Sequence, residues 1–296
     1  MKRLFFQVNV FSNSPFGGNP LAVFMDVEGL TIETMQKIAK EMKHSETTFV
    51  LPPGNLPADF SFRIFSPGKE LPFAGHPTLG TAHILRETGK VPDGDYPLKL
   101  ATKTGIITVT QKNNKNLLFM SQQLPEFQIP LNYEERIGEA LGIPKSSFIF
   151  SCPMQIVSTG LPVLIVPIIS LNALKKIVIN INKLKQVLEK LNTDIIYAFT
   201  QQTINSNASI HSRAFAPGIG IAEDPATGSA AGAVGAYLFK HDLVSGHISK
   251  NIHIEQGYQM GRPSSLYVEI DQENKMIKSI LVGGESVTVI EGWANF

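Results

Sequence analysis

The chain has 296 residues, with 26 Lys and Arg against 25 Asp and Glu, and 43% of its residues are hydrophobic. This length allows one large domain or two domains and the burial of about 75% of the unfolded surface, while the even charge balance leaves no electrostatic footprint for nucleic acid or an anionic membrane. The single cysteine, Cys152, excludes an internal disulfide and a multi-thiol metal site and suits a reducing compartment. We therefore expect a small-molecule partner.

The N-terminal segment begins like a signal peptide but is better interpreted as a first strand. Its apolar run is interrupted by Gln7 and Asn9, and no small-residue cleavage site follows. The longest apolar window elsewhere, residues 161–171, is too short to span a bilayer. These features predict a soluble, cytoplasmic protein that makes no membrane contact.

The first half of the chain begins with strands and one amphipathic helix. Residues 3–11 and 21–25 are rich in β-prone apolar residues and flank turn residues, which predicts two strands around a loop. Thr31 is a suitable N-cap, and the apolar residues after it fall on one helical face: Ile32, Met35, Ile38, Ala39 and Met42. Two β-prone segments follow, at residues 45–51 and 60–65.

Two stretches, residues 75–82 and 223–232, predict the starts of buried helices. Each contains a polar residue that can cap a helix, His76 or Asp224, followed by Pro in the first-turn position. Long uncharged stretches come next, so both helices should be buried on nearly all sides. A buried helix start presents unpaired N–H groups and a partial positive charge, and both favour a small anion. We therefore expect a carboxylate-binding site built from two helix ends.

The order of elements starts again after residue 142, which indicates a duplicated half. The segment Arg213-Ala214-Phe215-Ala216-Pro217-Gly218 matches Arg63-Ile64-Phe65-Ser66-Pro67-Gly68. The simplest packing for each half is a strongly curved sheet around its buried helix, so the predicted fold class is α+β. We expect an N-terminal lobe at residues 1–125 and a C-terminal lobe at residues 126–296. This prediction allows the C-terminal end of the chain to pack onto the N-terminal lobe. Ligand sites favour the interface between such halves. The alternative is that the Gly- and Ala-rich helix starts serve packing alone.

Five motifs, in the same order along the chain, resemble those of the PhzF-like phenazine-biosynthesis family, which shares the diaminopimelate epimerase fold. They are Phe16-Gly17-Gly18-Asn19-Pro20, Ser45-Glu46-Thr47-Thr48-Phe49, Phe73-Ala74-Gly75-His76-Pro77-Thr78, Glu223-Asp224-Pro225-Ala226-Thr227-Gly228-Ser229 and Gln256-Gly257-Tyr258-Gln259-Met260-Gly261-Arg262-Pro263. The resemblance implies two pseudo-symmetric barrel-like lobes, each around a central helix, with the site between them. It also implies no cofactor, no metal and commonly a homodimer. The namesake member isomerises a dihydro-hydroxyanthranilate.

The resemblance makes Glu46 the proton-transfer residue, and its surroundings agree. A carboxylate at the start of a buried strand is partly desolvated, which raises its pKa toward neutrality. The alternative is an exposed glutamate at a strand end. The corresponding segment of the second half, residues 195–199, contains no acid, so only one lobe would supply a base.

His76 and Asp224 also match site residues of the family, one in each half. We expect them to hold amine or hydroxyl groups of the substrate and to assist proton transfer. Gly75, Gly228 and Ser229 would bind its carboxylate through backbone N–H groups and a hydroxyl. The alternatives are that Asp224 only caps its helix and that His76 is structural.

The expected function is therefore a cofactor-independent isomerase that moves a proton on a small cyclic or amino acid-like carboxylate. Two alternatives stay open: a non-catalytic binding protein with the same fold, and an amino-acid epimerase or racemase. Epimerases of this fold use two facing cysteines at the central helix starts, and this chain has none there. Cys152 is instead expected to be a core thiol.

Overall fold

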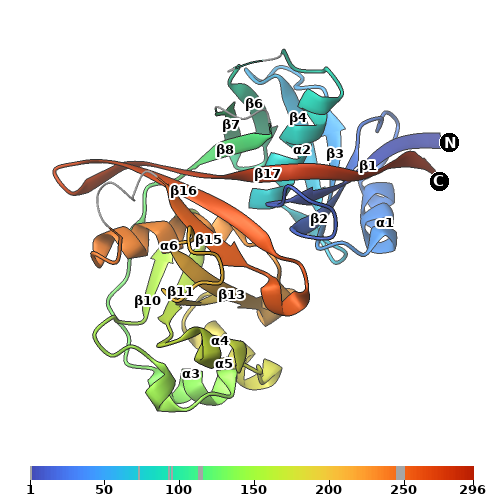
Figure 1. Cartoon of the computed structure of the whole chain (residues 1–296). Helices are drawn as coiled ribbons and strands as arrows, with labels where there is room; N and C mark the ends of the chain where they lie inside the picture. Colours follow the sequence, from blue (N-terminus) through green and yellow to red (C-terminus); the bar gives the residue numbers. More distant parts are fainter. Residues whose placement is uncertain (1, 73, 93, 95, 113–115, 245–250) are drawn as a thin grey trace. The chain divides into compact units, whose positions relative to one another are not determined.

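The computed structural model describes residues 2–72, 74–92, 94, 96–112, 116–244 and 251–296 (Figure 1). Its contacts divide the chain into unit 1, Met1–Ser121 with Gly283–Phe296, and unit 2, Gln122–Val282. The sequence predicted a boundary after residue 125 and allowed the C-terminal end of the second lobe, residues 126–296, to pack onto the first. Residues 283–296 belong to unit 1 because the long strand β17, Met276–Asn295, pairs with the first strand of the chain.

Unit 1 consists of a curved mixed sheet and two helices. Its strands are β1 (Lys2–Val10), β2 (Asn19–Phe24), β3 (Glu46–Leu51), β4 (Phe60–Phe65), β5 (Glu70–Leu71), β6 (Leu98–Thr102), β7 (Gly105–Gln111), β8 (Leu117–Gln122) and the end of β17. The pairings run from β17 through β1, β2, β3, β4, β6 and β7 to β8, with β2–β3 and β4–β6 parallel. Because β8 also pairs with β17, the sheet closes on itself like a barrel.

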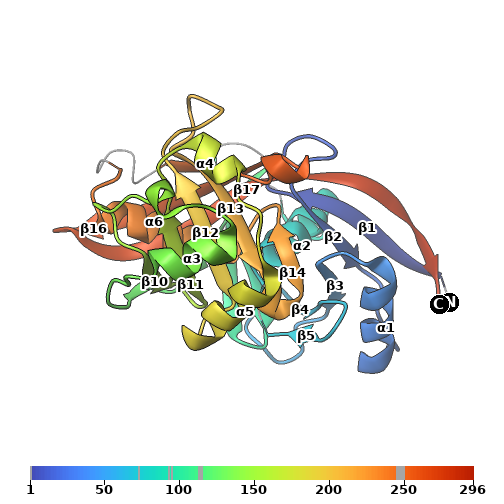
Figure 2. The ribbon, with the colours of Figure 1, turned by 90° about the horizontal axis from the view of Figure 1, so that it is seen from below.

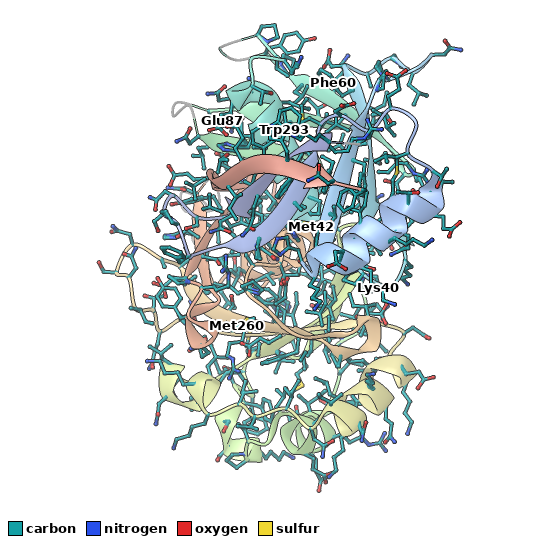
Figure 3. All side chains as sticks on the ribbon, turned by 90° about the vertical axis from the view of Figure 1, so that its right-hand side faces the viewer. Lys40, Met42, Phe60, Glu87, Met260 and Trp293 are labelled. Atoms are coloured by element: carbon teal, nitrogen blue, oxygen red, sulfur yellow. The ribbon has the colours of Figure 1, made fainter. Side chains whose placement is uncertain are left out.

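The two helices of unit 1 occupy different environments. Helix α2, Gly75–Glu87, contacts β1, β2 and β3 and is buried at almost every position, so it is the central helix of this unit. Helix α1, Ile32–Met42, contacts β3 and β4 on the outside (Figure 2). As expected, Thr31 caps α1, accepting a hydrogen bond from the backbone N–H of Thr34. Met42 packs against the core under this helix, whereas Lys40 is exposed (Figure 3).

Unit 2 repeats this plan with additional helices. Its strands are β9 (Glu126–Phe127), β10 (Gln155–Ser158), β11 (Pro162–Pro167), β12 (Ile195–Thr200), β13 (Ile210–Ala216), β14 (Ile221–Asp224), β15 (Ile252–Gln256), β16 (Ser264–Glu273) and the beginning of β17. Helices α3 (Glu134–Leu141), α4 (Leu171–Lys175) and α5 (Ile181–Lys190) share one apolar core with the sheet, whereas α6 (Gly228–Lys240) contacts β10, β11, β12 and β16 and is the buried central helix. None of the described helices has the length and apolarity required to cross a membrane.

The predicted internal repeat is visible in both topology and side chains. In unit 1, β2 is parallel to β3 and β3 is antiparallel to β4; β11, β12 and β13 repeat this arrangement in unit 2. Arg63 on β4 binds Glu70 through two hydrogen bonds of 2.7 Å each. Arg213, at the matching position, binds Glu223 through two hydrogen bonds of 2.8 Å each. The duplication thus includes a buried or half-buried ion pair as well as the strand order.

The glycines of α6 allow neighbouring side chains to pack closely against this helix. A Cβ atom on Gly232 would overlap Oε1 of Gln122, and one on Gly235 would lie 2.6 Å from Cγ1 of Val268. Both approaches are closer than a normal van der Waals contact. A side chain at either position would therefore force these neighbours to shift.

Candidate active site

Glu46 is the first residue of β3, and the fold buries it. The strand runs parallel to β2, with Leu21 paired to Glu46, and nearly all its residues are buried. The Glu46 residue is 8% exposed. Desolvation raises the pKa of its carboxyl group to about 7, against the opposing effect of a hydrogen bond from Ser45. The carboxyl group can therefore accept and return a proton near neutrality.

His76 lies beside this carboxyl group. It is the second residue of α2, and its Nε2 atom is 3.2 Å from Oε2 of Glu46. Both side chains are buried, with 7% and 11% of their surfaces exposed. The expectation that His76 caps the helix is wrong, because the N-cap is Ala74, whose side chain has no hydrogen-bonding group. Its position in the first turn instead directs the imidazole toward the acid on β3.

Gly75 begins α2 directly before His76 and is buried. In the first turn of any helix the backbone N–H groups lack intrahelical acceptors. Here, Thr78 donates its hydroxyl hydrogen to the carbonyl oxygen of Ala74, at 2.8 Å. Unit 1 therefore brings Glu46, at the start of β3, close to Gly75 and His76, at the start of α2.

Asp224 is the last residue of β14, where it pairs with Ala214 of β13. Its Oδ2 atom accepts a hydrogen bond of 2.6 Å from the hydroxyl group of Thr227. The expectations that Asp224 caps the helix and that Pro225 lies in its first turn are both wrong. Pairing within the sheet extends the strand through Asp224, so Thr227 takes the N-cap position and α6 begins at Gly228.

Gly228 and Ser229 are the first two residues of α6, the former buried and the latter half-buried. Gln122 donates a hydrogen bond of 2.9 Å to the carbonyl oxygen of Gly228 and thereby fixes the first turn. Unit 2 therefore places Asp224, Gly228 and Ser229 within one short segment at a helix start. An anion at such a helix end would meet backbone N–H donors.

Three polar residues beside Asp224 were missed by reasoning from the sequence: Thr227, Gln256 and Tyr197. Gln256 ends β15, and its amide group donates to the backbone oxygen of Asp224 and to the hydroxyl of Thr227. The side-chain oxygen of Gln256 accepts from the hydroxyl of Tyr197, at 3.0 Å. The motifs contained Thr227 and Gln256, but nothing in the sequence indicated that they meet.

Among the residues that the structure describes, no three His, Cys, Asp or Glu side chains lie close enough to hold a metal ion. Cys152 is buried, its Sγ atom lies 3.0 Å from the hydroxyl of Tyr237, and desolvation raises the pKa of the thiol. This environment agrees with a core thiol.

Known proteins resemble this chain in fold and in sequence. A crystal structure of a Bacillus anthracis phenazine biosynthesis protein of the PhzF family has a TM-score of 0.88 and 29% identity, with all of both chains covered. A probable proline racemase from Agrobacterium radiobacter, only 12% identical, has a TM-score of 0.64 over 99% of this chain and 92% of its own, and shows the shared fold alone. The trans-2,3-dihydro-3-hydroxyanthranilate isomerase of Pseudomonas chlororaphis is 35% identical over 96% of each chain.

Further relatives of similar identity are also named isomerases. Together with the barrel-like units and their buried central helices, these relatives define the protein as an isomerase with the diaminopimelate epimerase-like fold. The profile of the PhzC-PhzF phenazine biosynthesis-like proteins matches residues 8–292, and the chain belongs to that family.

Proposed function

We propose that the protein is a cofactor-independent isomerase that moves a proton on a small carboxylate-bearing metabolite, with Glu46 as the single acid/base residue. The observation that carries this proposal is the buried Glu46 carboxyl group, whose pKa is raised to about 7, in contact with His76. A group with such a pKa is present in both protonation states near neutral pH, as a residue that first accepts and then returns a proton must be.

The proposed reaction needs no oxidant or co-reactant. Glu46 as a carboxylate takes a proton from a carbon of the substrate, and the electron pair of the broken C–H bond enters the conjugated system that ends in the substrate carboxylate. The Glu46 carboxylic acid then returns the proton to another carbon of that system. Backbone N–H groups at Gly75, Gly228 and Ser229 would stabilise the negative charge, and His76 and Asp224 would bind amine or hydroxyl groups.

The name of one relative supports a proposal for the substrate class. The Pseudomonas chlororaphis relative, 35% identical, is named for trans-2,3-dihydro-3-hydroxyanthranilate, a ring compound that has a carboxylate, an amine and a hydroxyl group. We propose a substrate of this kind, cyclic or amino acid-like, with a proton next to a conjugated carboxylate.

The test is solvent deuterium incorporation into trans-2,3-dihydro-3-hydroxyanthranilate, followed by NMR in D2O. Glu46→Gln should slow the exchange by about 10²–10⁴-fold, the range typical of a general acid/base residue. The exposed Glu41 on α1 gives the matched control, and Glu41→Gln should exchange at the wild-type rate.

Calorimetric binding of 3-hydroxyanthranilate, the aromatic counterpart of that substrate, separates the remaining alternatives. If Glu46→Gln binds this analogue with unchanged affinity, its loss of exchange reflects chemistry rather than misfolding. Wild-type binding without any exchange would support a non-catalytic binding protein. Exchange at a stereocentre with both hands of the product formed would instead indicate a racemase.

We also infer a homodimer, and this inference rests on the family resemblance. Static light scattering of the purified protein should give about twice the 32.4 kDa mass of the chain. A mass of one chain at micromolar concentration would contradict it.

A further inference from the structure

The side-chain amide of Gln256 has only one chemically consistent orientation. Its Oε1 atom lies 3.2 Å from the backbone nitrogen of Thr227, and its Nε2 atom lies 2.7 Å from the backbone oxygen of Asp224. A backbone N–H group can only donate and a backbone carbonyl can only accept. Exchanging the nitrogen and oxygen of the amide would break both hydrogen bonds. The orientation of the Gln256 amide is therefore determined by the backbone groups of Thr227 and Asp224.

The orientation of Gln256 in turn determines where the Thr227 hydroxyl hydrogen points. Nε2 of Gln256 also donates to Oγ1 of Thr227, at 2.9 Å. With this donor on its oxygen, Thr227 directs its own hydrogen to the acceptor that remains in contact, Oδ2 of Asp224 at 2.6 Å. The hydrogen bonds therefore run in one direction, from Gln256 through Thr227 to the carboxylate of Asp224.

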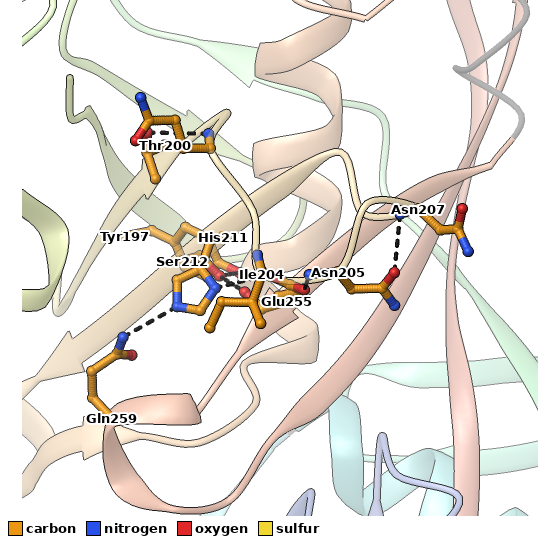
Figure 4. Close-up of polar contacts among 10 residues, drawn as sticks. Tyr197, Thr200, Ile204, Asn205, Asn207, His211, Ser212, Glu255 and Gln259 are labelled. Atoms are coloured by element: carbon orange, nitrogen blue, oxygen red, sulfur yellow. Dashed lines mark hydrogen bonds and ion pairs between the residues drawn. The ribbon is translucent and has the colours of Figure 1, made fainter. Parts of the chain in front are cut away.

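The series of hydrogen bonds begins at Tyr197, a residue of the sheet. Tyr197 on β12 is fully buried, and desolvation raises the pKa of its hydroxyl above the usual range, so it remains a donor to Oε1 of Gln256. Ser212 lies 2.8 Å from the same hydroxyl. Figure 4 shows Tyr197 and Ser212 beside Glu255, whose backbone oxygen accepts from Ser212 at 2.8 Å.

A close backbone approach holds Gln256 against the Asp224 segment. The next residue, Gly257, has φ +81°, and a Cβ atom there would lie 2.5 Å from the carbonyl oxygen of Pro225. Gln256 and Tyr197 are both completely buried and Thr227 is 8% exposed. A buried side chain with all its polar atoms engaged has one orientation, and loss of one partner leaves the others unsatisfied.

We propose that Gln256 is a positioning residue that acts through the Thr227 hydroxyl to orient the carboxylate of Asp224 for substrate binding. Gln256 does not touch the substrate; it fixes the group that does. This inference rests on the proposed role of Asp224 in binding an amine or hydroxyl group of the substrate. It assigns a function to the glutamine of the Gln256-Gly257 motif, which the acid/base mechanism does not use.

The first test compares Thr227→Val, which removes the hydroxyl with little change in shape, with Thr227→Ser, which keeps it. The measured quantities are the dissociation constant of 3-hydroxyanthranilate and the KM and kcat for trans-2,3-dihydro-3-hydroxyanthranilate. Thr227→Val should weaken binding and raise KM by about tenfold, the effect of one hydrogen bond to a charged group, with a smaller change in kcat. Thr227→Ser should restore both to within about twofold of the wild type.

The second test asks whether the effect passes through Asp224. In an Asp224→Ala background, Thr227→Val should cause no further loss of affinity, because the group that it orients is gone. Tyr197→Phe, which removes the donor to Gln256 together with the contact to Ser212, should weaken binding by a smaller factor and should likewise have no effect in that background. Thermal unfolding of every variant shows whether it is folded.

An equal loss of affinity with and without Asp224 would show that Thr227 and Gln256 act on stability alone and would overturn the proposal. An Asp224→Ala variant that binds like the wild type would overturn it as well, by removing its premise. Neither result affects the proposed acid/base role of Glu46, because that role depends on loss of exchange in Glu46→Gln. The two proposals can therefore fail separately.

Discussion

Burial of Glu46 favours its protonated form, and this has a consequence for stability. Burial raises the pKa of this carboxyl group to about 7 in the folded chain, from an ordinary value of 4.5. Between these two values the folded state binds more protons than the unfolded state. The free energy of unfolding must therefore fall as the pH rises through this window.

The difference in pKa corresponds to a stability penalty of about 3 kcal/mol above pH 7. Glu46→Gln removes the titrating group but keeps its size, so it should raise the free energy of unfolding at pH 8 by up to that amount and change it little at pH 4.5. Denaturant unfolding at the two pH values measures the difference. The same shift at both pH values would mean that the carboxyl group does not titrate as its burial requires.

The environment of a single residue could be predicted from the sequence where it depends on neighbouring residues in the chain. Glu46 was expected to be desolvated because the residues after it are β-prone, and its burial agrees with this. The contacts of Gln256 with Asp224, Thr227 and Tyr197 were not foreseen because these residues are 29 or more positions away from it in the sequence, on or next to other strands. Hydrogen bonds between such strands depend on strand register, which no local pattern of residues determines.

At the scale of elements, the central helices were foreseen, but their starting residues were not. The uncharged stretches correctly indicated that α2 and α6 are buried. The cap at Asp224 was wrong because helix propensity competes with strand pairing, and the pairing of Asp224 with Ala214 prevails. At α2 the helix begins one residue before His76, with Ala74 as its N-cap. The Thr31 cap was correct because α1 lies on the outside of the sheet, where local preferences decide.

The close packing of α6 gives a prediction for this element. In Gly232→Ala the new methyl group would overlap the amide of Gln122, which also accepts a hydrogen bond from Thr159. We expect a loss of about 1–3 kcal/mol in the free energy of unfolding, typical of overpacking, measured by denaturant titration.

Gly68 is the matched control for this substitution. A Cβ atom there has no neighbour within 4 Å, so Gly68→Ala should change stability by less than about 1 kcal/mol. Equal effects of the two substitutions would show that Gln122 moves aside easily and that α6 tolerates side chains on this face.

At the scale of the whole molecule, the end of the chain completes the unit that contains its beginning. Residues of β17 pair with β1 along its full length, from Lys2 with Asn295 to Val10 with Ser286 (Figure 2). The sequence could not establish this pairing because the partners are separated by almost the entire chain. The ring of strands around α2 therefore depends on the last ten or so residues.

A chain that ends at Glu285 lacks the strand that pairs with β1, so β1 becomes an unpaired edge next to the core of unit 1. Hydrogen exchange should then show protection lost for amides of β1 and β2, while amides of α6 in unit 2 stay protected. A chain lacking only Phe296, whose ring contacts Phe24, keeps every β1–β17 pair and is the control. Protected β1 amides in the shorter chain would mean that unit 1 holds together without its last strand and that the contacts of α2 with β1, β2 and β3 suffice.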